Sequence, residues 1–427
     1  MVKLRRLASF VLAVILTLPI IRSAMAAAPG AAAPALVGVP VEFYLFVAML
    51  LGIAFFHRHA LAVAFAGLTA ILAYEGGVSG FPTGFGPAAL GAHFGHEWVI
   101  LTNLLLLLVG FEVLSSQFEL SNMPNHMPAL LPDDWRGGLV LLAIVFVLSG
   151  FLDNIAASVI GGVIARHVYA GRVRIGYLAA IVAAANAGGA GSVIGDTTTT
   201  IIWLKGISPL AVLPAYVAAL VSFLVIAPVA AVAQQRHRAI LRHDEPGRPM
   251  AWRRVAIVGF VLLSAVAANL AANLLSSGEE TGPWLGLAIW AALIATAPFA
   301  KPDWSVLRPA FRGALFLIAL VTSASLMPVD ALPPPSLVST LGLGFLSAVF
   351  DNIPLTALAL EQEGYDWALL AFAVGFGGSI TWFGSSAGVA LTNLFPEGRS
   401  AVRWLREGWY VPLGYLAGFL ALSVLPG

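Results

Sequence analysis

The sequence lacks cysteine and is poor in charge. Of its 427 residues, 10% are Asp, Glu, Lys or Arg, whereas an average soluble domain has about 25%. Without cysteine the chain has no disulfide, no thiol nucleophile and no zinc–thiolate centre. So few charges could not cover the surface of a soluble protein of this length, and the net charge of +1 gives no reason to expect a nucleic-acid partner. The absence of cysteine excludes thiol enzymes and disulfide scaffolds, and no nucleic-acid partner is expected.

Apolar residues are abundant instead, and they gather in blocks. Hydrophobic residues make up 59% of the chain, in runs of roughly 15–25 that match a bilayer core of about 30 Å. We therefore predict an all-α polytopic membrane protein with about ten transmembrane helices, two of them interrupted, and two re-entrant hairpins. The predicted spans are 40–57, 60–75, 98–116, 175–205, 208–233, 255–275, 283–299, 313–328, 367–394 and 409–424, and the hairpins are 137–165 and 336–362.

The N-terminus has the three parts of an export signal. Basic residues, Lys3, Arg5 and Arg6, precede the apolar run Leu7–Ile21, and Ala24–Ala26 has the A-x-A form of a cleavage site. We interpret this segment as a signal peptide, with an uncleaved N-terminal anchor as the alternative. In both cases the chain that follows starts on the outside, behind an Ala/Pro-rich tether.

Basic residues in the loops predict the orientation. If the first span starts outside the cell membrane, the predicted spans place the loop Lys and Arg residues on the cytoplasmic side. Only Lys205 is then left outside. Short cytoplasmic loops collect Lys and Arg because these residues resist translocation. The bias holds only if both hairpins turn back instead of crossing. The pattern predicts a bacterial-type inner-membrane protein whose N-terminus after cleavage and C-terminus are both periplasmic.

The two halves carry the same motifs in the same order. Each has an Asp-Asn pair in its hairpin, then a Gly-Gly pair, and a further glycine after five more residues. An odd number of spans separates the hairpins, so the copies face opposite sides of the membrane, which is the inverted repeat of many secondary transporters. The matched motifs are Asp153-Asn154, Gly188-Gly189 and Gly195 in one half, and Asp351-Asn352, Gly377-Gly378 and Gly384 in the other. The predicted domains are a signal peptide or anchor (1–26), a tether (27–39), a first repeat (40–233), a cytoplasmic Arg-rich linker (234–254) and a second, inverted repeat (255–427).

Four carboxylates lie inside apolar segments, namely Glu112, Asp153, Asp196 and Asp351. A charge at the bilayer centre costs about 2.5–3.5 kcal/mol even on a lenient insertion scale, so such residues are candidates for function. A carboxylate can hold either a proton or a cation, and competition between the two is the simplest chemistry of a cation/proton antiporter. Glu112, near the end of its span, is the candidate proton carrier.

The Asp-Asn pairs and the residues after the matched glycines form the predicted ion site. Asp supplies negative charge, while Asn, Thr and Ser supply neutral oxygens, the ligands that a small hard cation requires. We expect the chain to unwind at Gly195–Thr200 and Gly384–Ser386, since glycine lets a chain leave helical geometry. Helix capping is the alternative role of Asp and Asn, and Thr199 and Thr200 are expected to bond back to backbone carbonyls. The predicted ion-binding residues are Asp153, Asn154, Gly195, Asp196, Thr197, Thr198, Asp351, Asn352, Gly384, Ser385 and Ser386.

At these motifs the chain resembles the ion transporter superfamily, most closely its NhaD-type sodium/proton antiporters. The resemblance covers 40–427 in architecture and is carried by the Asp-Asn hairpins together with the Gly-Asp-Thr and Gly-Ser-Ser segments at 195–197 and 384–386. It implies exchange of sodium or lithium for protons, with Asp153, Asp351 and the neighbouring hydroxyls as sodium ligands. Sodium ions and protons are then the transported species, and no other cofactor is expected.

Two other functions remain as alternatives. A sodium-coupled citrate or dicarboxylate transporter of the same superfamily typically has Ser-Asn-Thr at its hairpin tips, whereas this chain has Asp-Asn-Ile, whose carboxylates would repel an anionic substrate. An intramembrane aspartyl protease would use Asp196 and Asp351 as a dyad, but this chain lacks the Gly-x-Gly-Asp form. We therefore expect a transporter and no enzyme. The expected partners are small ions and the lipid bilayer. For the assembly, a homodimer is an alternative to a monomer.

Overall fold

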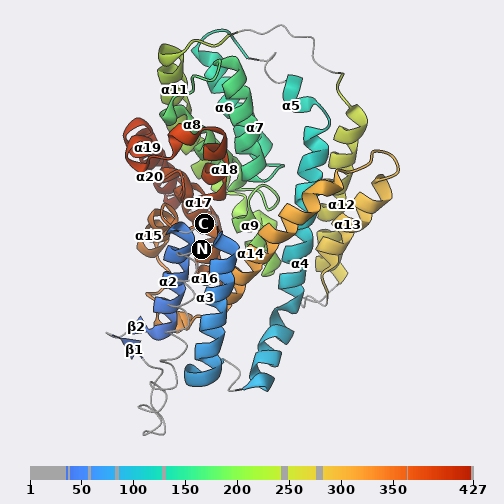
Figure 1. Ribbon diagram of the computed structural model, residues 1–427, viewed down its shortest axis with the longest axis vertical. Helices are drawn as coiled ribbons and strands as arrows, with labels where there is room; N and C mark the ends of the chain where they lie inside the picture. Colours follow the sequence, from blue (N-terminus) through green and yellow to red (C-terminus); the bar gives the residue numbers. More distant parts are fainter. Residues whose placement is uncertain are drawn as a thin grey trace.

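The computed structural model describes residues 35–36, 39–55, 59–81, 86–126, 131–241, 249–275, 282–362 and 364–424. The predicted signal peptide, most of the tether and part of the Arg-rich linker lie outside the described residues. What is described is almost entirely helical (Figure 1). The exception is a two-residue pairing of β1 (Ala35–Leu36) with β2 (Val39–Pro40) at the end of the predicted tether. The all-α prediction is therefore confirmed for this part of the chain.

The first half of the chain runs from α2 to α11. Its elements are α2 (Val41–Phe55), α3 (Ala60–Tyr74), the π-helix η2 (Glu75–Ser79), α4 (Pro87–Glu119), α5 (Met123–His126), α6 (Trp135–Ser149), α7 (Asn154–Val168), α8 (Ile175–Gly189), α9 (Thr197–Leu204), α10 (Pro209–Val212) and α11 (Ala215–His237).

The second half runs from α12 to α20. Its elements are α12 (Trp252–Leu275), α13 (Trp284–Thr296), η4 (Trp304–Val306), α14 (Leu307–Ser325), η5 (Val329–Ala331), α15 (Leu337–Ser347), α16 (Asn352–Gln362), α17 (Trp367–Gly377), η6 (Gly378–Ile380), α18 (Ser386–Leu394), η7 (Pro396–Gly398), α19 (Ala401–Glu407) and α20 (Tyr410–Ser423).

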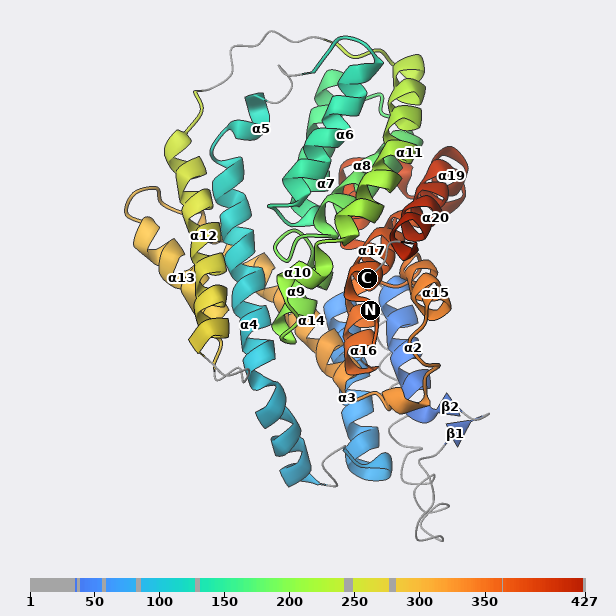
Figure 2. The ribbon, with the colours of Figure 1, turned by 180° about the vertical axis from the view of Figure 1, so that it is seen from behind.

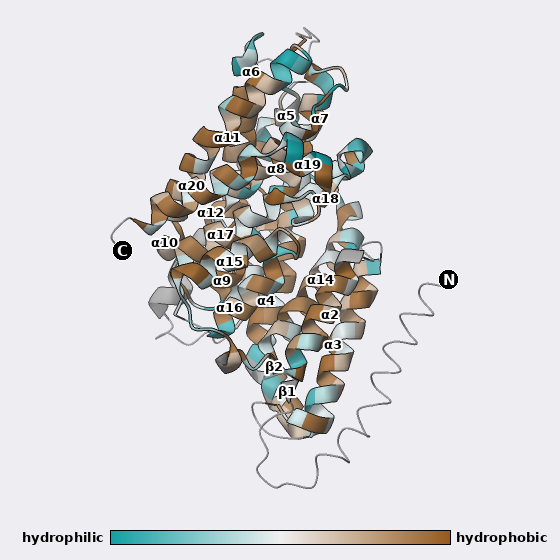
Figure 3. Cartoon of the chain, turned by 90° about the vertical axis from the view of Figure 1, so that its left-hand side faces the viewer, coloured by the Kyte–Doolittle hydropathy of each residue, from teal (hydrophilic) through white to brown (hydrophobic). Residues whose placement is uncertain are grey.

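Helices suited to a membrane make up much of the molecule. Four described stretches are long and apolar enough to cross one, and several shorter apolar helices accompany them. Large apolar side chains point outward, including Leu224, Leu263 and Leu420, which are 68%, 70% and 61% exposed. Hydrophobic residues make up much of the helices (Figure 3). Such a surface is suited to lipid. The four long stretches are Ala60–Ser79, Glu97–Glu119, Pro209–His237 and Trp304–Ser325.

The chain turns and breaks where the matched motifs predict. Helices α6 and α7 are separated by the turn 150–153, and α15 and α16 by the turn 348–351; we call these pairs hairpin one and hairpin two. The chain between α8 and α9, residues 190–196, is break one, and the chain between η6 and α18, residues 381–385, is break two. Each half thus has a hairpin followed by an interrupted helix.

The unwinding predicted at Thr197–Thr200 is wrong. These four threonines form the first turn of α9, because Asp196 accepts a hydrogen bond from the Thr198 backbone N–H and so caps the helix. The unwound chain ends at Asp196 in break one, and at Ser385 in break two. The threonines therefore present helix-ordered hydroxyls, not loop hydroxyls.

Helix α4 also extends well before the span predicted at 98–116. Its first turns contain His93 and Glu97, which read as polar loop residues in the sequence, yet both are buried. His93 Nε2 lies 3.2 Å from Ser325 Oγ, and Glu97 pairs with Lys205. These polar residues make contacts with residues far away in the sequence, which a hydropathy pattern cannot predict.

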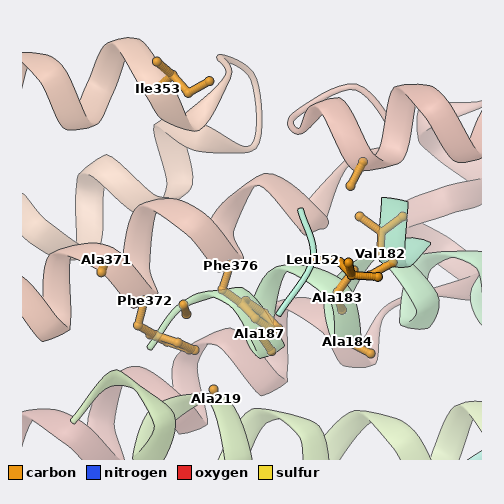
Figure 4. Packing of buried hydrophobic residues seen from close by; sticks show 14 of the residues in the cluster. Leu152, Val182, Ala183, Ala184, Ala187, Ala219, Ile353, Ala371, Phe372 and Phe376 are labelled. Atoms are coloured by element: carbon orange, nitrogen blue, oxygen red, sulfur yellow. The ribbon is translucent and has the colours of Figure 1, made fainter. Parts of the chain in front are cut away.

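Helices α8 and α17 are the centre of the core, and every one of the described residues of α8 is buried. The matched glycines explain how these helices pack. A Cβ at Gly188 would lie 1.9 Å from Phe146 O of α6, and one at Gly377 would lie 2.1 Å from Gly344 O of α15. Small residues allow this close approach of backbones in membrane helices. Around them, aromatic rings such as Phe372 fill the space against alanines (Figure 4).

The helices form two lateral groups. Helices α4, α12 and α13 pack together at one edge of the molecule, and α11, α20 and α17 pack together on the opposite side (Figure 2). Helix α14 contacts α4 of the first group, and it also contacts α3 and α16.

Candidate functional site

Hairpin two binds break one directly. The Asn352 side chain, 3% exposed, donates from Nδ2 to Asp196 Oδ1 at 3.2 Å and to Thr198 Oγ1 at 2.8 Å. Asn352 is the first residue of α16, whereas Asp196 and Thr198 begin α9. The hairpin of the second half therefore holds the interrupted helix of the first half.

Hairpin one makes the reciprocal connection through a residue that we did not predict. Asn154 Nδ2 donates to Asn186 Oδ1 at 3.1 Å. Asn186 Nδ2 in turn donates to Ser379 Oγ at 2.9 Å and to Ser385 Oγ at 3.2 Å, both in the second half. The signal available in the sequence was an amide inside the Ala/Gly-rich run of α8, two residues before Gly188.

The aspartates are helix caps as well as charged groups. Asp153 Oδ1 accepts from the Ile155 N–H at 3.0 Å at the start of α7, so the capping interpretation is confirmed for Asp153 as for Asp196. At hairpin two, Asp351 Oδ2 accepts from Ser386 Oγ at 2.8 Å. Capping occupies only part of each carboxylate.

Two carboxylate oxygens at this place are buried with no hydrogen-bond donor, Asp196 Oδ2 and Asp351 Oδ1. An unpaired buried polar atom costs free energy, and a charged one costs more. Either oxygen would be relieved by a proton or by a cation. Glycine at position 375 lets α17 approach this carboxylate closely, since a Cβ there would lie 2.8 Å from Asp196 Oδ2.

A cavity of about 290 Å³ opens at the hairpin tips. Its wall combines residues of α4, α7, α9, α14, α16 and α18. Two carboxylates, Glu112 and Asp153, reach it, and the described lining contains no Lys, Arg or His. Asp351 lies one hydrogen bond behind the lining residue Ser386. The polar part of the wall is thus acidic and supplies neutral oxygens as well, which suits a small cation, while the α14 side of the wall is apolar.

The predicted site residues fall into three groups. Six line the cavity, and Asp196, Thr198, Asp351 and Ser385 lie in the hydrogen-bond network behind it. The six are Glu112, Asp153, Asn154, Thr197, Asn352 and Ser386.

Gly195 and Gly384 form the third group, and they shape the backbone without lining the cavity. A Cβ at Gly195 would lie 1.8 Å from Ser149 O, and one at Gly384 would lie 2.7 Å from Ser347 O. The Gly195 carbonyl accepts from the Asn154 N–H at 3.1 Å. Both glycines let a break approach the hairpin of its own half.

Thr199 and Thr200 behave as predicted. Thr199 Oγ1 donates to Asp196 O at 2.8 Å and to Ser192 O at 2.5 Å, and Thr200 Oγ1 donates to Asp196 O at 2.9 Å and to Val193 O at 2.8 Å. Both hydroxyls bond back to backbone carbonyls. They stabilise break one and leave no hydroxyl proton for the site.

Lys205, at the end of α9, joins three helices in one ion cluster. Its Nζ lies 2.8 Å from Glu361 Oε1 of α16 and 3.5 Å from Glu97 Oε1 of α4. Burial acts to lower the pKa of Lys205, but the carboxylates of Glu361 and Glu97 outweigh it, and the pKa is raised above its ordinary value. The ammonium therefore stays charged and ties α4 to both hairpin two and the interrupted helix.

Known proteins that resemble this chain are antiporters. Sodium/proton antiporter 1 of Arabidopsis thaliana is 29% identical over 59% of this chain and 49% of its own length. Sodium/proton antiporter 2 of the same plant is 26% identical over 58% of this chain and 67% of its own length. The Na(+)/H(+) antiporter NhaD of Vibrio parahaemolyticus is 27% identical, over 58% of this chain and 71% of its own length.

The resemblance to NhaD-type sodium/proton antiporters is confirmed. No family model matches the chain. The chain spans about half the length of the first of these relatives. The relatives carry names of transporters, not of enzymes, and their names together with the apolar helices support a transmembrane transport protein.

Proposed function

We propose that this chain exchanges sodium, or lithium, for protons across a bacterial-type inner membrane. The main support is the acidic cavity. Asp153 of hairpin one lines it, and so does Ser386, whose hydroxyl donates to Asp351 of hairpin two. The names of the relatives agree with this activity. Sodium is then a substrate, and the protein needs no further cofactor.

In this proposal the cation binds between the two hairpin tips. Asp153 and Asp351 supply the charge, and Thr197, Ser386 and the side-chain oxygen of Asn352 supply neutral ligands, the hard oxygen donors that small cations prefer. A proton on either carboxyl group removes the charge that holds the cation. Sodium and protons therefore compete for the same atoms, which couples their movements.

The same cavity argues against an anionic substrate such as citrate. Its described lining has hydroxyl and amide groups, but it also has Glu112 and Asp153 and no basic side chain that would balance the charge of an anion. Two negative groups at the wall would repel a di-anion. We therefore favour cation exchange over the anion symport that the superfamily also contains.

Alternating access follows if the halves form an inverted repeat. We infer first and second repeats at 40–233 and 255–427, joined by the linker 234–254, with hairpins that enter from opposite sides and turn back. Support comes from the crossed bonds, in which Asn352 holds break one and Asn154 reaches break two through Asn186. Movement of either hairpin then alters the interrupted helix of the other half.

The position of the cavity suggests which side is open. Its wall includes Pro309, Ala310 and Gly313 near the start of α14, the end that the loop charges predict to be cytoplasmic. The Lys205 cluster lies at the opposite, periplasmic end in the same threading. We infer that the structure is open to the cytoplasm and closed outside by the Lys205 cluster.

The test is ion-driven proton movement in everted membrane vesicles. Sodium, lithium, potassium and citrate are added in turn to vesicles with wild type, Asp153→Asn or Asp351→Asn. Asp303→Asn is the matched control, because Asp303 caps the short helix η4 away from the cavity and Asn can cap as well. We expect sodium and lithium to collapse the proton gradient in wild type and control only. No sodium- or lithium-dependent change in wild type would overturn the proposal.

A further inference from the structure

A second cavity lies on the other side of α14 and takes no part in the site described above. It has a volume of about 650 Å³, within the range of about 300–1,000 Å³ typical of small-molecule sites. Apolar side chains of α4, α13 and α14 form its walls. Trp290 belongs to them, and its indole N–H is already used, since Nε1 donates to Leu106 O at 2.9 Å. The surface of the groove is therefore hydrocarbon, because the one polar group of this indole is already hydrogen-bonded.

One edge of this groove carries two positive charges. Arg308 and Arg312 are four residues apart on α14, so they lie on one face of the helix. Both are exposed. No ion pair or hydrogen bond to either side chain occurs among the described residues, and no Asp or Glu lines this groove. Within the described part of the chain, the arginines thus have no partner for their charge.

We propose that this groove binds an anionic phospholipid, with an acyl chain in the groove and the phosphate between Arg308 and Arg312. Charge complementarity supports this occupant, because basic residues beside an apolar space between membrane helices suit an anionic head group. The membrane supplies the ligand, since α14 belongs to a stretch long and apolar enough to span it. A zwitterionic lipid would leave the pair of arginines without a net counter-charge.

The lipid would brace the wall of the cation cavity. Successive residues of a helix are rotated by about 100°, so α14 has two roughly opposite faces here. One face has Leu307, Arg308, Phe311 and Arg312. The other has Pro309, Ala310, Gly313 and Leu317. The first set faces the groove and the second set faces the cation cavity. An acyl chain packed behind α14 therefore limits how far this helix can move away from the hairpins.

The experiment measures lipid binding to the whole purified protein, so its result does not depend on transport. Protein stripped of lipid in detergent is titrated with phosphatidylglycerol or phosphatidylcholine, and bound lipid is counted by native mass spectrometry. The variant is Arg308→Gln/Arg312→Gln. Lys301→Gln/Arg406→Gln is the matched control, because it removes two exposed basic residues that do not line the groove.

We expect tighter binding of phosphatidylglycerol than of phosphatidylcholine in wild type and control. The arginine variant should lose roughly 30-fold in affinity for phosphatidylglycerol, since each basic residue near an anionic lipid contributes roughly a five-fold factor. Leu105→Trp, which fills the groove and leaves the arginines in place, should lower binding of both lipids at that site.

Three results would overturn the lipid site. One is equal affinity of wild type for the two lipids. Another is equal loss of affinity in the arginine variant and in the control. The third is a protein whose dimer dissociates on Leu105→Trp while its lipid binding is unchanged, because the groove would then hold a second copy of the chain. Transport by these variants is a separate readout, so failure of the antiport proposal leaves the lipid result intact.

Discussion

The bond from Asn352 to Thr198 should appear as a coupling energy between the two halves of the chain. The donor and acceptor are 2.8 Å apart, and the residues are 3% and 0% exposed. Hydrogen bonds between membrane helices give coupling energies of about 0.6 kcal/mol on average and up to about 1.7 kcal/mol. Because the distance is short and both side chains are buried, we expect about 1 kcal/mol for this pair.

The assay is a double-mutant cycle. Equilibrium unfolding in mixed micelles is followed by tryptophan fluorescence for wild type, Asn352→Ala, Thr198→Ala and the double variant. Asn352→Ala alone should lower the free energy of unfolding by about 2–4 kcal/mol, since it also removes the bond to the buried Asp196 carboxyl group. The cycle cancels that loss and isolates the contact with Thr198.

A second cycle is the control. Thr392 is a buried threonine whose hydroxyl donates to Val389 O of its own helix. Asn352→Ala combined with Thr392→Ala should be additive to within about 0.3–0.5 kcal/mol. Equal coupling in the two cycles, or none with Thr198, would refute the direct contact between hairpin two and the interrupted helix of the first half.

Three further predictions concern the packing, the ion cluster and the cavity. Gly377→Ala should destabilise the protein strongly, because the added Cβ would lie 2.1 Å from a backbone oxygen. Gly342→Ala should be neutral or mildly stabilising, because a Cβ there meets nothing within 4 Å. The measurement is the melting temperature of each variant. Lys205→Met should cost about 1–3 kcal/mol in unfolding free energy, because the buried Glu97 and the part-exposed Glu361 lose their partner. Since the Lys205 pKa is raised in the folded state, the wild-type contribution should persist below the ordinary lysine pKa of about 10.4 and disappear as the pH rises through the raised value. Glu112→Gln should raise the sodium concentration needed for half-maximal exchange in vesicles, because it removes a negative charge that interacts with Asp153; an unchanged value would remove Glu112 from the site.

Local patterns in the sequence were enough to predict the turns of the hairpins, the breaks and the polar residues of the cavity wall, but not the wall that α14 supplies. The Asp-Asn pairs and matched glycines are local signals, whereas the steric reason for glycine at 188 and 377, a backbone oxygen of another helix, is seen only in the structure. The threonine run misled us because Asp196 ends the unwound chain by capping α9, and a cap is decided by backbone geometry.

Long-range partners could not be predicted in the same way. Asn186 bonds to Ser379 and Ser385, which are 193 and 199 residues away, so nothing near it in the sequence indicates its role. The polar start of α4 is a similar case, since Glu97 is buried against Lys205 of another helix. The position of α14 between two cavities likewise depends on tertiary packing, although its two faces can be read once the fold is known.

The central claim is that Asp153 and Asp351 form one site at which sodium displaces a proton. Calorimetric titration of the purified protein with sodium, in buffers of different protonation enthalpy, measures both binding and proton release. We expect saturable binding with release of protons in wild type and in Asp303→Asn, and loss of both in Asp153→Asn and in Asp351→Asn. Sodium binding that is unchanged in the latter two variants, or that releases no proton in wild type, would contradict the account.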